Sequence, residues 1–399
     1  MLPSPSVHTQ GKVTLRVLGT GVTLVDAIHE RACADLGLNI EFQVLDGVGA
    51  QQQAVMRQDS FDIYDQWFHS VELLWLAGAI QGIDTSRISE WGQVNALSKE
   101  GRLTSDVQVA PGEAPIKRLY VQRDGSLGPR ACDRISMLPG AHNVDSFGYN
   151  LEQIPNGVPY ETESWGWLLD DKWRGRVALV NDPAIGVMDA ALAVQAAGLM
   201  SFENIGNMTL DEIDGLVAIL LQKKSAGHFK KFWNSFAEAD ELMARRDVVM
   251  ESMWSPSVTG LRVRGVPVRY SSPKEGYRAW HGGMCISSRS TGRVLDATYE
   301  YLNWWMAGWP GAVMARQGYY FSIPDLVREH LSEAEWNFWY RGEAAAEDLL
   351  DPNGKIAVHI GEIRDGGSYW KRFANIGVWN SIMDEHNYLV RRWDELINS

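Results

Sequence analysis

The chain has 399 residues, which is too long for one ordinary hydrophobic core and predicts two lobes. Apolar residues make up 45% and charged residues 22% of a sequence without low-complexity tracts, so we expect it to be folded throughout. The formal net charge of −13 disfavours nucleic acid as a partner, because phosphate binding relies on clustered Lys and Arg. A cationic or zwitterionic partner fits this charge better, although many soluble proteins are acidic.

The opening segment, MLPSPSVHTQGK, lacks the apolar region of a signal peptide, and no apolar run approaches the roughly 18 residues of a membrane span. Its polar, Pro- and Ser-rich character is typical of a secreted protein whose signal peptide has been replaced by a starting Met. We therefore expect a periplasmic protein, while a cytoplasmic one stays open.

Strand and helix patterns alternate in the first part of the sequence. Thr20, Gly21 and Thr23 are available to open the first helix. The pattern predicts strands at Val13–Gly19, Asn39–Leu45 and Phe61–Gln66, with helices at Thr23–Leu36 and Ala50–Gln58. Such alternation builds a parallel sheet covered by helices, whose ligands bind beyond the carboxyl ends of the strands.

The middle of the sequence repeats this pattern. It predicts an Ala-rich helix at Ala184–Leu199 and strands at Arg176–Asn181, Val248–Trp254, Val268–Ser271 and Gly283–Ser287. Two stretches with Gly, Pro and Ser, 93–115 and 125–140, are predicted to be loops. From Ser332 onward the pattern is mainly helical, and we expect its tryptophans in the core: Trp336, Trp339, Trp370, Trp379 and Trp393.

The three cysteines, Cys33, Cys132 and Cys285, lie far apart without a CxxC or Cys/His spacing. This disfavours a zinc site and a thioredoxin-like centre. Buried, inert thiols are favoured for Cys33 and Cys285, and one disulfide stays possible.

Four segments, in this order, carry a resemblance to a known family: FDIYDQWFHSV (61–71), NVDSFGYN (143–150), the stretch 164–182 and the stretch 273–319. Together they resemble the spermidine/putrescine-binding branch of the bacterial extracellular solute-binding proteins. SWGWLLDDKWRGRVALVND is similar to that family's Ser-Trp, helix turn, Gly and strand ending in Asp, although Leu168-Leu169 replaces the usual Leu-Trp.

The resemblance implies a Venus-flytrap fold, the two-lobed α/β fold of periplasmic binding proteins, with strands crossing between the lobes. It implies residues 12–144 plus 281–325 in lobe 1 and residues 145–280 plus 326–399 in lobe 2. It further implies a monomer without a cofactor that presents its ligand to an ABC permease in the inner membrane. In such a protein, closure of the lobes on the ligand is the two-state change that the permease recognises.

The resemblance also places aromatic ligand contacts in the cleft. Trp67, Phe68 and His69 follow a strand at its carboxyl end, while Trp254 and Trp280 match the pair that holds an alkyl-ammonium chain. Tyr319 matches a further cleft tyrosine. An aromatic face attracts an ammonium group by about 0.5–2 kcal/mol. Trp67 could instead cap the sheet, and His69 could begin a helix.

A buried cation also needs a carboxylate. The acidic positions of the family fall on Asp182, Ile185 and Gly282, so one acid remains, and Asp145 at the lobe crossing could add another. An Asx turn and a loop cap are equally good explanations of these two residues. One cationic centre fits this set better than spermidine.

A zwitterion whose carboxylate is held by His69, Thr20 or a helix N-terminus also fits. The expected ligand is thus an amino-acid derivative, a betaine, an opine or a polyamine-like amine. The chain has no GxSxG, HExxH, P-loop or GxGxxG motif, so we do not expect an enzyme. Two alternatives stay open: a carbohydrate-active enzyme, suggested by the many tryptophans, and a ferric-ion binder, suggested by Tyr319 and Tyr320.

Overall fold

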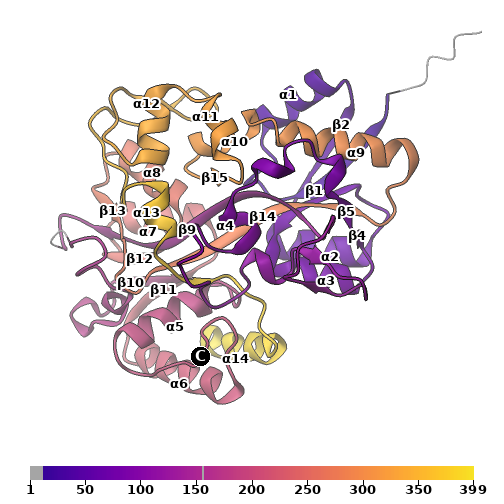
Figure 1. Ribbon diagram of the computed structural model, residues 1–399. Coiled ribbons are helices and arrows are strands. Elements are labelled where there is room, and N and C mark those ends of the chain that lie inside the picture. Colours follow the sequence, from indigo (N-terminus) through magenta and orange to yellow (C-terminus); the bar gives the residue numbers. More distant parts are fainter. Residues whose placement is uncertain (1–11, 155–156) are drawn as a thin grey trace, which may run out of the picture.

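The computed structural model describes residues 12–154 and 157–399, so the opening segment predicted to follow a signal peptide lies largely outside it. A mixed sheet of twelve strands runs through the described residues, with a main path in the order β11-β10-β12-β9-β14-β3-β1-β2 (Figure 1). Its strands are β1 (Thr14–Gly19), β2 (Asn39–Val44), β3 (Ile63–Trp67), β4 (Ile80–Gln81), β9 (Leu138–Asn150), β10 (Val177–Val180), β11 (Phe229–Trp233), β12 (Met250–Met253), β13 (Val268–Tyr270), β14 (Tyr277–Ser287), β15 (Tyr320–Phe321) and β18 (Ile376–Trp379).

Each end of this sheet is parallel. β1 pairs with β2 and β3, and β10 pairs with β11 and β12, in parallel register. Parallel strands need crossover connections, and helices supply most of them here. The helices are α1 (Asp26–Leu36), α2 (Gly47–Met56), α3 (Val71–Leu76), α4 (Ala96–Glu100), α5 (Gly186–Ala196), α6 (Leu210–Ser225), α7 (Phe236–Ala244), α8 (Ser255–Val263), α9 (Gly292–Trp305), α10 (Trp309–Arg316), α11 (Pro324–Arg328), α12 (Glu333–Trp336), α13 (Tyr369–Phe373) and α14 (His386–Asn398). The predicted alternation of strand and helix is confirmed.

Two long antiparallel strands join the two ends of the sheet. β9 pairs with β14 and β15 through its first half and with β12 and β13 through its second half. Asn143 lies opposite Trp280, while three residues later Ser146 lies opposite Met253. All of β9 and β14 is buried. Figure 1 shows both strands crossing the centre of the molecule.

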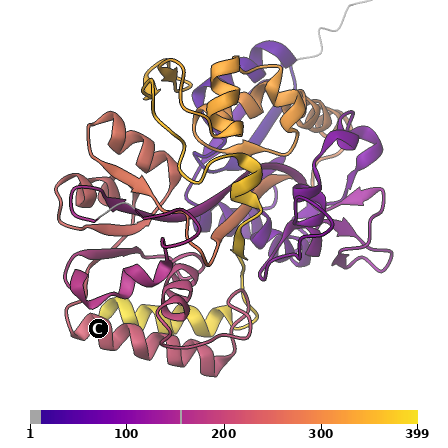
Figure 2. The same cartoon turned by 60° about the vertical axis from the view of Figure 1, so that its left-hand side comes forward.

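Separate cores lie on the two sides of this crossing. One contains Val17, Ile63 and Leu302, and the other contains Leu179, Leu216 and Trp393. α14 packs against α6 in the second core, where the two helices lie side by side (Figure 2).

The lobe boundaries stay a prediction, and the packing bears on one of them. Trp339, Tyr369 and Trp379 belong to the first core, whereas Val378 and Met383 belong to the second. We therefore propose that the last boundary lies at β18 rather than after residue 325.

Several local predictions were wrong. The first helix begins at Asp26, because backbone bonds from Leu24 to Thr20 and from Val25 to Thr23 hold the preceding residues in a turn. Stretch 93–115 contains α4, and 125–140 contains two strands of a small sheet formed by β5 (Ile83–Asp84), β6 (Tyr120–Val121), β7 (Leu127–Gly128) and β8 (Arg134–Ile135).

The C-terminal region is only partly helical. It contains a hairpin formed by β16 (Leu349–Leu350) and β17 (Ile356–Val358). Four of its five named tryptophans are buried, whereas Trp370 on the short helix α13 is 46% exposed. Thus the core prediction was wrong for Trp370.

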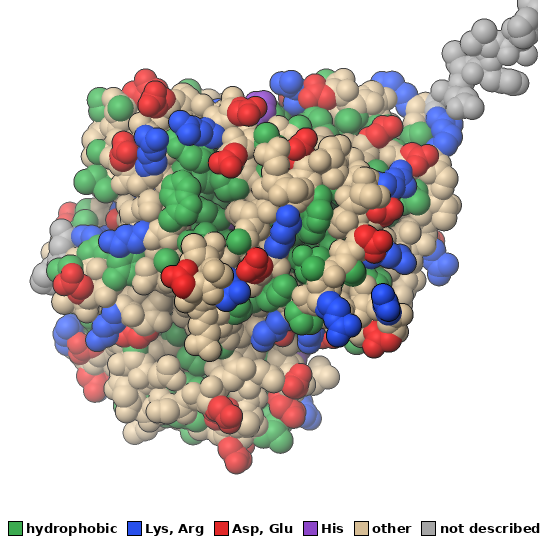
Figure 3. Space-filling model, viewed as in Figure 1, with side chains coloured by type: hydrophobic (Ala, Val, Ile, Leu, Met, Phe, Trp, Pro, Cys, Tyr) green, Lys and Arg blue, Asp and Glu red, His purple; other side chains and the backbone are tan. Residues whose placement is uncertain are grey.

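Lys and Arg side chains are interspersed with Asp and Glu over the face shown in Figure 3. Within the described ranges, no helix combines the length and apolarity required to cross a membrane. The three cysteines are free; Cys285 is buried, Cys33 partly buried and Cys132 exposed.

Candidate ligand-binding cleft

A cleft of about 980 Å³ opens at the carboxyl ends of the parallel strands. Thr20 follows β1, Trp67 ends β3, Asp182 follows β10 and Trp254 follows β12, and each of these residues lines the cleft. The topology explains this meeting, since the carboxyl ends of parallel strands share one edge of a sheet. The crossing strand β9 adds Asp145.

Seven of the nine candidate residues thus share one lining: Thr20, Trp67, Asp145, Asp182, Trp254, Trp280 and Tyr319. Phe68 lies outside it, because the 3₁₀ turn after β3 directs this side chain into the core, where its ring meets His281 edge-on at 5.6 Å. His69 also lies outside the lining and stacks on Trp67, with ring centroids 5.7 Å apart. Burial lowers the pKa of His69 to about 4, so its imidazole is neutral at pH 7.

Aromatic rings form two groups in the cleft. Trp280 and Tyr319 make an edge-to-face pair with centroids 5.6 Å apart. Trp254 meets Phe236 at 4.4 Å, and Phe236 is 42% exposed. Both arrangements leave ring surface along the same cavity, where a cation could meet aromatic faces.

The position of Trp67 depends on the glycine at position 47. Gly47 is the first residue of α2 and also lines the cleft. A Cβ at this position would stand 2.9 Å from Cη2 of Trp67 and closer still to Cζ3. The indole therefore lies against the start of α2 because that position carries no side chain.

A buried charge network lies behind Asp145. Arg278 Nη1 is 3.5 Å from a carboxylate oxygen of Asp145, and Arg278 Nε donates to Asp189 at 2.6 Å. Arg278 Nη1 also donates to the amide oxygen of Asn380, which lines the cleft. Two carboxylates thus face one guanidinium. Burial raises the pKa of Asp145 to about 7, against the opposing effect of Arg278.

Asp182 has one oxygen engaged locally. Its Oδ1 accepts hydrogen bonds from the backbone N–H groups of Ala184 and Ile185, which is the Asx turn foreseen from the sequence. Asp182 nevertheless lines the cleft together with Ile185, whereas Gly282 lies within β14 opposite Trp67. The apolar Ile185 and the missing side chain of Gly282 leave fewer carboxylates than the resemblance would imply.

The sequence patterns do not predict some of the residues that line the cleft. Ser235 and Phe236 start α7 after β11, and Ser235 accepts a hydrogen bond from the Glu238 N–H. The Ser-Phe-Ala-Glu pattern of a helix start after a strand could have revealed this pair. Asn380 and the turn from Asp351 to Lys355 also line the cleft, and no local sequence pattern predicts this position for them.

The tyrosine pair divides between two environments. Tyr319 lines the cleft, whereas Tyr320 is fully buried and accepts a hydrogen bond from Arg364 Nε at 2.9 Å. Residues 12–154 and 157–399 hold no group of three or more His, Cys, Asp or Glu side chains arranged to bind a metal ion.

Comparison with known proteins identifies the family. A family model described as bacterial extracellular solute-binding protein matches residues 96–320, which is more than half of the chain. The chain belongs to this family. It is therefore a solute-binding protein and not an enzyme.

Solved structures confirm the fold of this solute-binding protein. A putative spermidine/putrescine ABC transporter from Listeria monocytogenes is 14% identical, with a TM-score of 0.64 over 96% of this chain and 98% of that one. The TpPotD lipoprotein of Treponema pallidum is 10% identical, with a TM-score of 0.67 over 97% and 100%. AgtB of A. tumefaciens R10, solved with agropinic acid, is 12% identical, with a TM-score of 0.61 over 98% and 100%. The expected two-lobed α/β periplasmic-binding-protein fold is thus confirmed.

Proposed function

We propose that this solute-binding protein serves an ABC importer and captures one small cationic or zwitterionic nitrogen-containing metabolite in the cleft. The observation that carries the proposal is the meeting of four aromatic side chains with two carboxylates in one lining: Trp67, Trp254, Trp280, Tyr319, Asp145 and Asp182. Aromatic faces and carboxylates are the two groups that attract an ammonium ion in a partly dry site.

The charge network supports a cation near Asp145. Asp145 and Asp189 together face the single guanidinium of Arg278, and a second oxygen of Asp189 has no hydrogen-bond partner among the described residues. A cation at Asp145 would compensate the excess negative charge. Because buried charges are unfavourable without partners, this compensation would favour the ligand-bound form.

The small number of carboxylates favours a ligand with one cationic centre. Where the resemblance leads us to expect two more acids, the chain has Ile185 and Gly282. A long polyamine would leave its distal ammonium groups without carboxylates at these positions, which would weaken its binding. Amino-acid derivatives, betaines and opines place one cationic nitrogen close to a carboxylate and fit better.

A zwitterion would also find donors for its carboxylate. The N-cap residues of α1 and α8, Val25 and Trp254, provide no side-chain hydrogen bond, and both residues line the cleft. Free backbone N–H groups at a helix start bind anions. Because His69 lies outside the cleft lining, we propose Thr20 and the start of α1 as the donors. At the start of α8, Pro256 has no N–H and the Ser257 N–H already donates to the Trp254 carbonyl. AgtB, whose structure holds the opine agropinic acid, has the same fold.

For transport, a membrane partner must recognise the ligand-bound form of the protein. We propose that the ligand bridges the residues on both sides of β9 and favours the closed form, which an inner-membrane ABC permease then recognises. A monomer in the periplasm fits this role.

Two measurements test the proposal. Mass spectrometry of the denatured protein directly after purification should reveal a nitrogenous compound carried from the cell. A thermal-shift screen of amines, amino acids, betaines, opines and sugars should then show a rise in melting temperature with nitrogenous compounds, because a ligand that binds the folded state stabilises it. A response to sugars alone would contradict the ligand class.

Substitutions then locate the site. Trp254→Ala and Trp280→Ala should each lose the ligand-induced shift while keeping the circular dichroism spectrum of the folded protein. Trp370→Ala is the matched control, because Trp370 is 46% exposed and lies outside the cleft lining. Unchanged ligand affinity in both cleft variants would assign these two rings a packing role only.

A further inference from the structure

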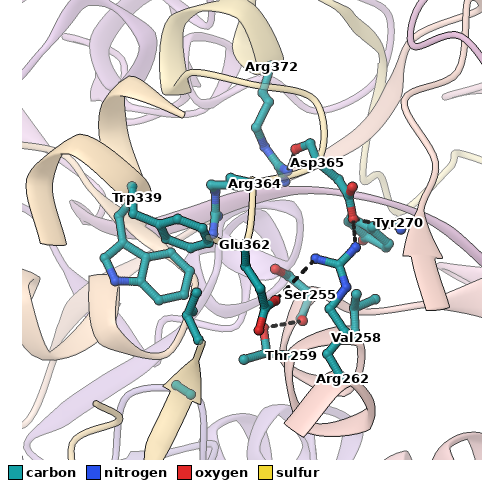
Figure 4. Close-up of a pocket in the computed structure, with 13 residues that line it drawn as sticks. Ser255, Val258, Thr259, Arg262, Tyr270, Trp339, Glu362, Arg364, Asp365 and Arg372 are labelled. Atoms are coloured by element: carbon teal, nitrogen blue, oxygen red, sulfur yellow. Dashed lines mark hydrogen bonds and ion pairs between the residues drawn. The ribbon is translucent and has the colours of Figure 1, made fainter. Parts of the chain in front are cut away.

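A second, much smaller cavity lies behind the cleft. Its volume is about 30 Å³, and its walls come from α8, β13, β17, residues 338–339 and the stretch 362–372 (Figure 4). Thr259 and Ala357 line both cavities, so one thin wall separates them. A space of this size is enough for one small ion or for one or two water molecules, since a water needs about 10–15 Å³ on this measure.

Arg364 and Arg372 both line this cavity and lie almost out of reach of solvent, with exposed fractions of 6% and 1%. Arg364 donates to the Tyr320 hydroxyl and to the Gly318 carbonyl, each at 2.9 Å. Arg372 donates to the carbonyls of Asp365 and Val144, at 2.9 and 3.3 Å. These acceptors are all neutral, and in the described part of the chain neither guanidinium has a carboxylate oxygen within 4.0 Å.

The Nε of Arg372 has no hydrogen-bond partner among the described residues. Burial lowers the pKa of Arg364, and the charge of Arg372 adds to this effect. Burial also acts to lower the pKa of Arg372, but the neighbouring tyrosines outweigh it and raise that pKa. The aromatic rings beside them help only in part. Arg364 lies 4.6 Å from the ring centroid of Trp339, and Arg372 lies 5.4 Å from that of Tyr277.

The carboxylates around the cavity already have other partners. Asp365 and Glu362 both pair with Arg262, and Asp365 also lies 3.8 Å from Arg269. Arg269 in turn pairs with the buried Glu163 at 3.2 Å. Among the charged side chains that line the cavity, three guanidinium groups thus stand against two carboxylates: Arg262, Arg364 and Arg372 against Glu362 and Asp365.

We propose that this cavity binds one small inorganic monoanion of the chloride class between Arg364 and Arg372. A monoanion matches the single excess positive charge, fits the volume and gives the Arg372 Nε an acceptor. Buried charges without a counter-charge destabilise a fold, so the ion would stabilise the folded protein.

The ion would also act on the cleft from behind. Arg364 holds the carbonyl of Gly318, directly before Tyr319, and Arg372 holds the carbonyl of Val144, directly before Asp145. An anion that fixes both guanidinium groups therefore braces the backbone at two cleft residues. This is a structural role for the ion, and it holds whichever solute the cleft binds.

The test uses the full chain without organic ligand. We expect a higher melting temperature in sodium chloride than in sodium gluconate at equal ionic strength, together with broadening of the chloride NMR line by the folded protein. Arg364→Met and Arg372→Met should lose both effects. Arg123→Met, at an exposed arginine in the turn between β6 and β7, should keep them.

Several outcomes would overturn the proposal. Equal melting temperatures of the wild-type protein in the two salts would do so, as would a full chloride effect in folded Arg364→Met and Arg372→Met variants. If these variants do not fold, crystals of the wild-type protein soaked in sodium bromide decide the matter. An anomalous bromide peak between the two guanidinium groups supports the proposal, and a water molecule there refutes it.

Discussion

Replacing Gly47 with alanine should weaken ligand binding without touching the ligand. The new Cβ would stand 2.9 Å from Cη2 of Trp67, closer than any ordinary van der Waals contact, so the indole must move away from the start of α2. Moving the ring removes one aromatic contact with a cation, about 0.5–2 kcal/mol, which corresponds to an affinity loss of about 2- to 30-fold. The helix itself should not suffer, because alanine is a better helix former than glycine.

Gly21→Ala is the matched control. Gly21 also lines the cleft, but a Cβ there would meet only Val44 Cγ1, at an ordinary 4.0 Å. Isothermal titration calorimetry with the compound found in the screen gives the two affinities, and a crystal structure of Gly47→Ala gives the position of the ring. Equal affinities for Gly47→Ala, Gly21→Ala and the wild-type protein, with Trp67 displaced, would refute a role of this ring in binding.

Three further predictions follow from the charges and the packing. Asp145→Asn should lower the affinity for a cationic ligand by about 10- to 150-fold, which corresponds to the loss of a charged hydrogen bond and is measured by calorimetry. The variant should remain folded by circular dichroism, because Arg278 still pairs with Asp189 at 2.6 Å. Because burial raises the pKa of Asp145 to about 7, affinity for a cation should fall as pH drops through 7, to about one tenth of its high-pH value at pH 6. The same pH dependence in Asp145→Asn would contradict this role of Asp145. Trp393→Ala should destabilise the fold by about 3–5 kcal/mol in urea unfolding, since this ring is 1% exposed; a loss below 1 kcal/mol would contradict its core role.

The sign of the Asp145 contribution to folding is opposite to its effect on binding. In the unfolded chain this carboxyl group ionises with a pKa of about 3.9. In the folded protein it retains its proton up to about pH 7, so the folded state binds more protons between these values. The contribution of Asp145 to the free energy of unfolding therefore decreases as pH rises from about 4 to about 7. Affinity for a cation rises over the upper part of the same window.

The sequence best predicted those cleft residues that lie at the ends of strands. Thr20, Trp67, Asp182 and Trp254 each follow or end a strand with a clear apolar pattern, and parallel pairing brings such positions together. Phe68 and His69 show the limit of this reasoning, because a 3₁₀ turn of three residues decides which way each ring points. A strand pattern does not encode that turn.

The remaining gaps come from contacts between distant segments. Asn380 reaches the cleft only through β18, which pairs with β14 about a hundred residues earlier in the chain. The β16–β17 hairpin enters the lining in the same indirect way. Trp370 was expected in the core on residue type alone, yet its short helix exposes it. Neither periodicity nor composition contains this long-range information.

The continuous strand β9 has a consequence for how the chain folds. Its first half hydrogen bonds to β14 and β15, and its second half to β12 and β13, without a break between them. If one side of the molecule unfolded alone, the other side would lose its partners along a buried strand and expose an unpaired edge. The two lobes should therefore melt in one cooperative transition, and either lobe produced without the other should aggregate rather than form a stable domain.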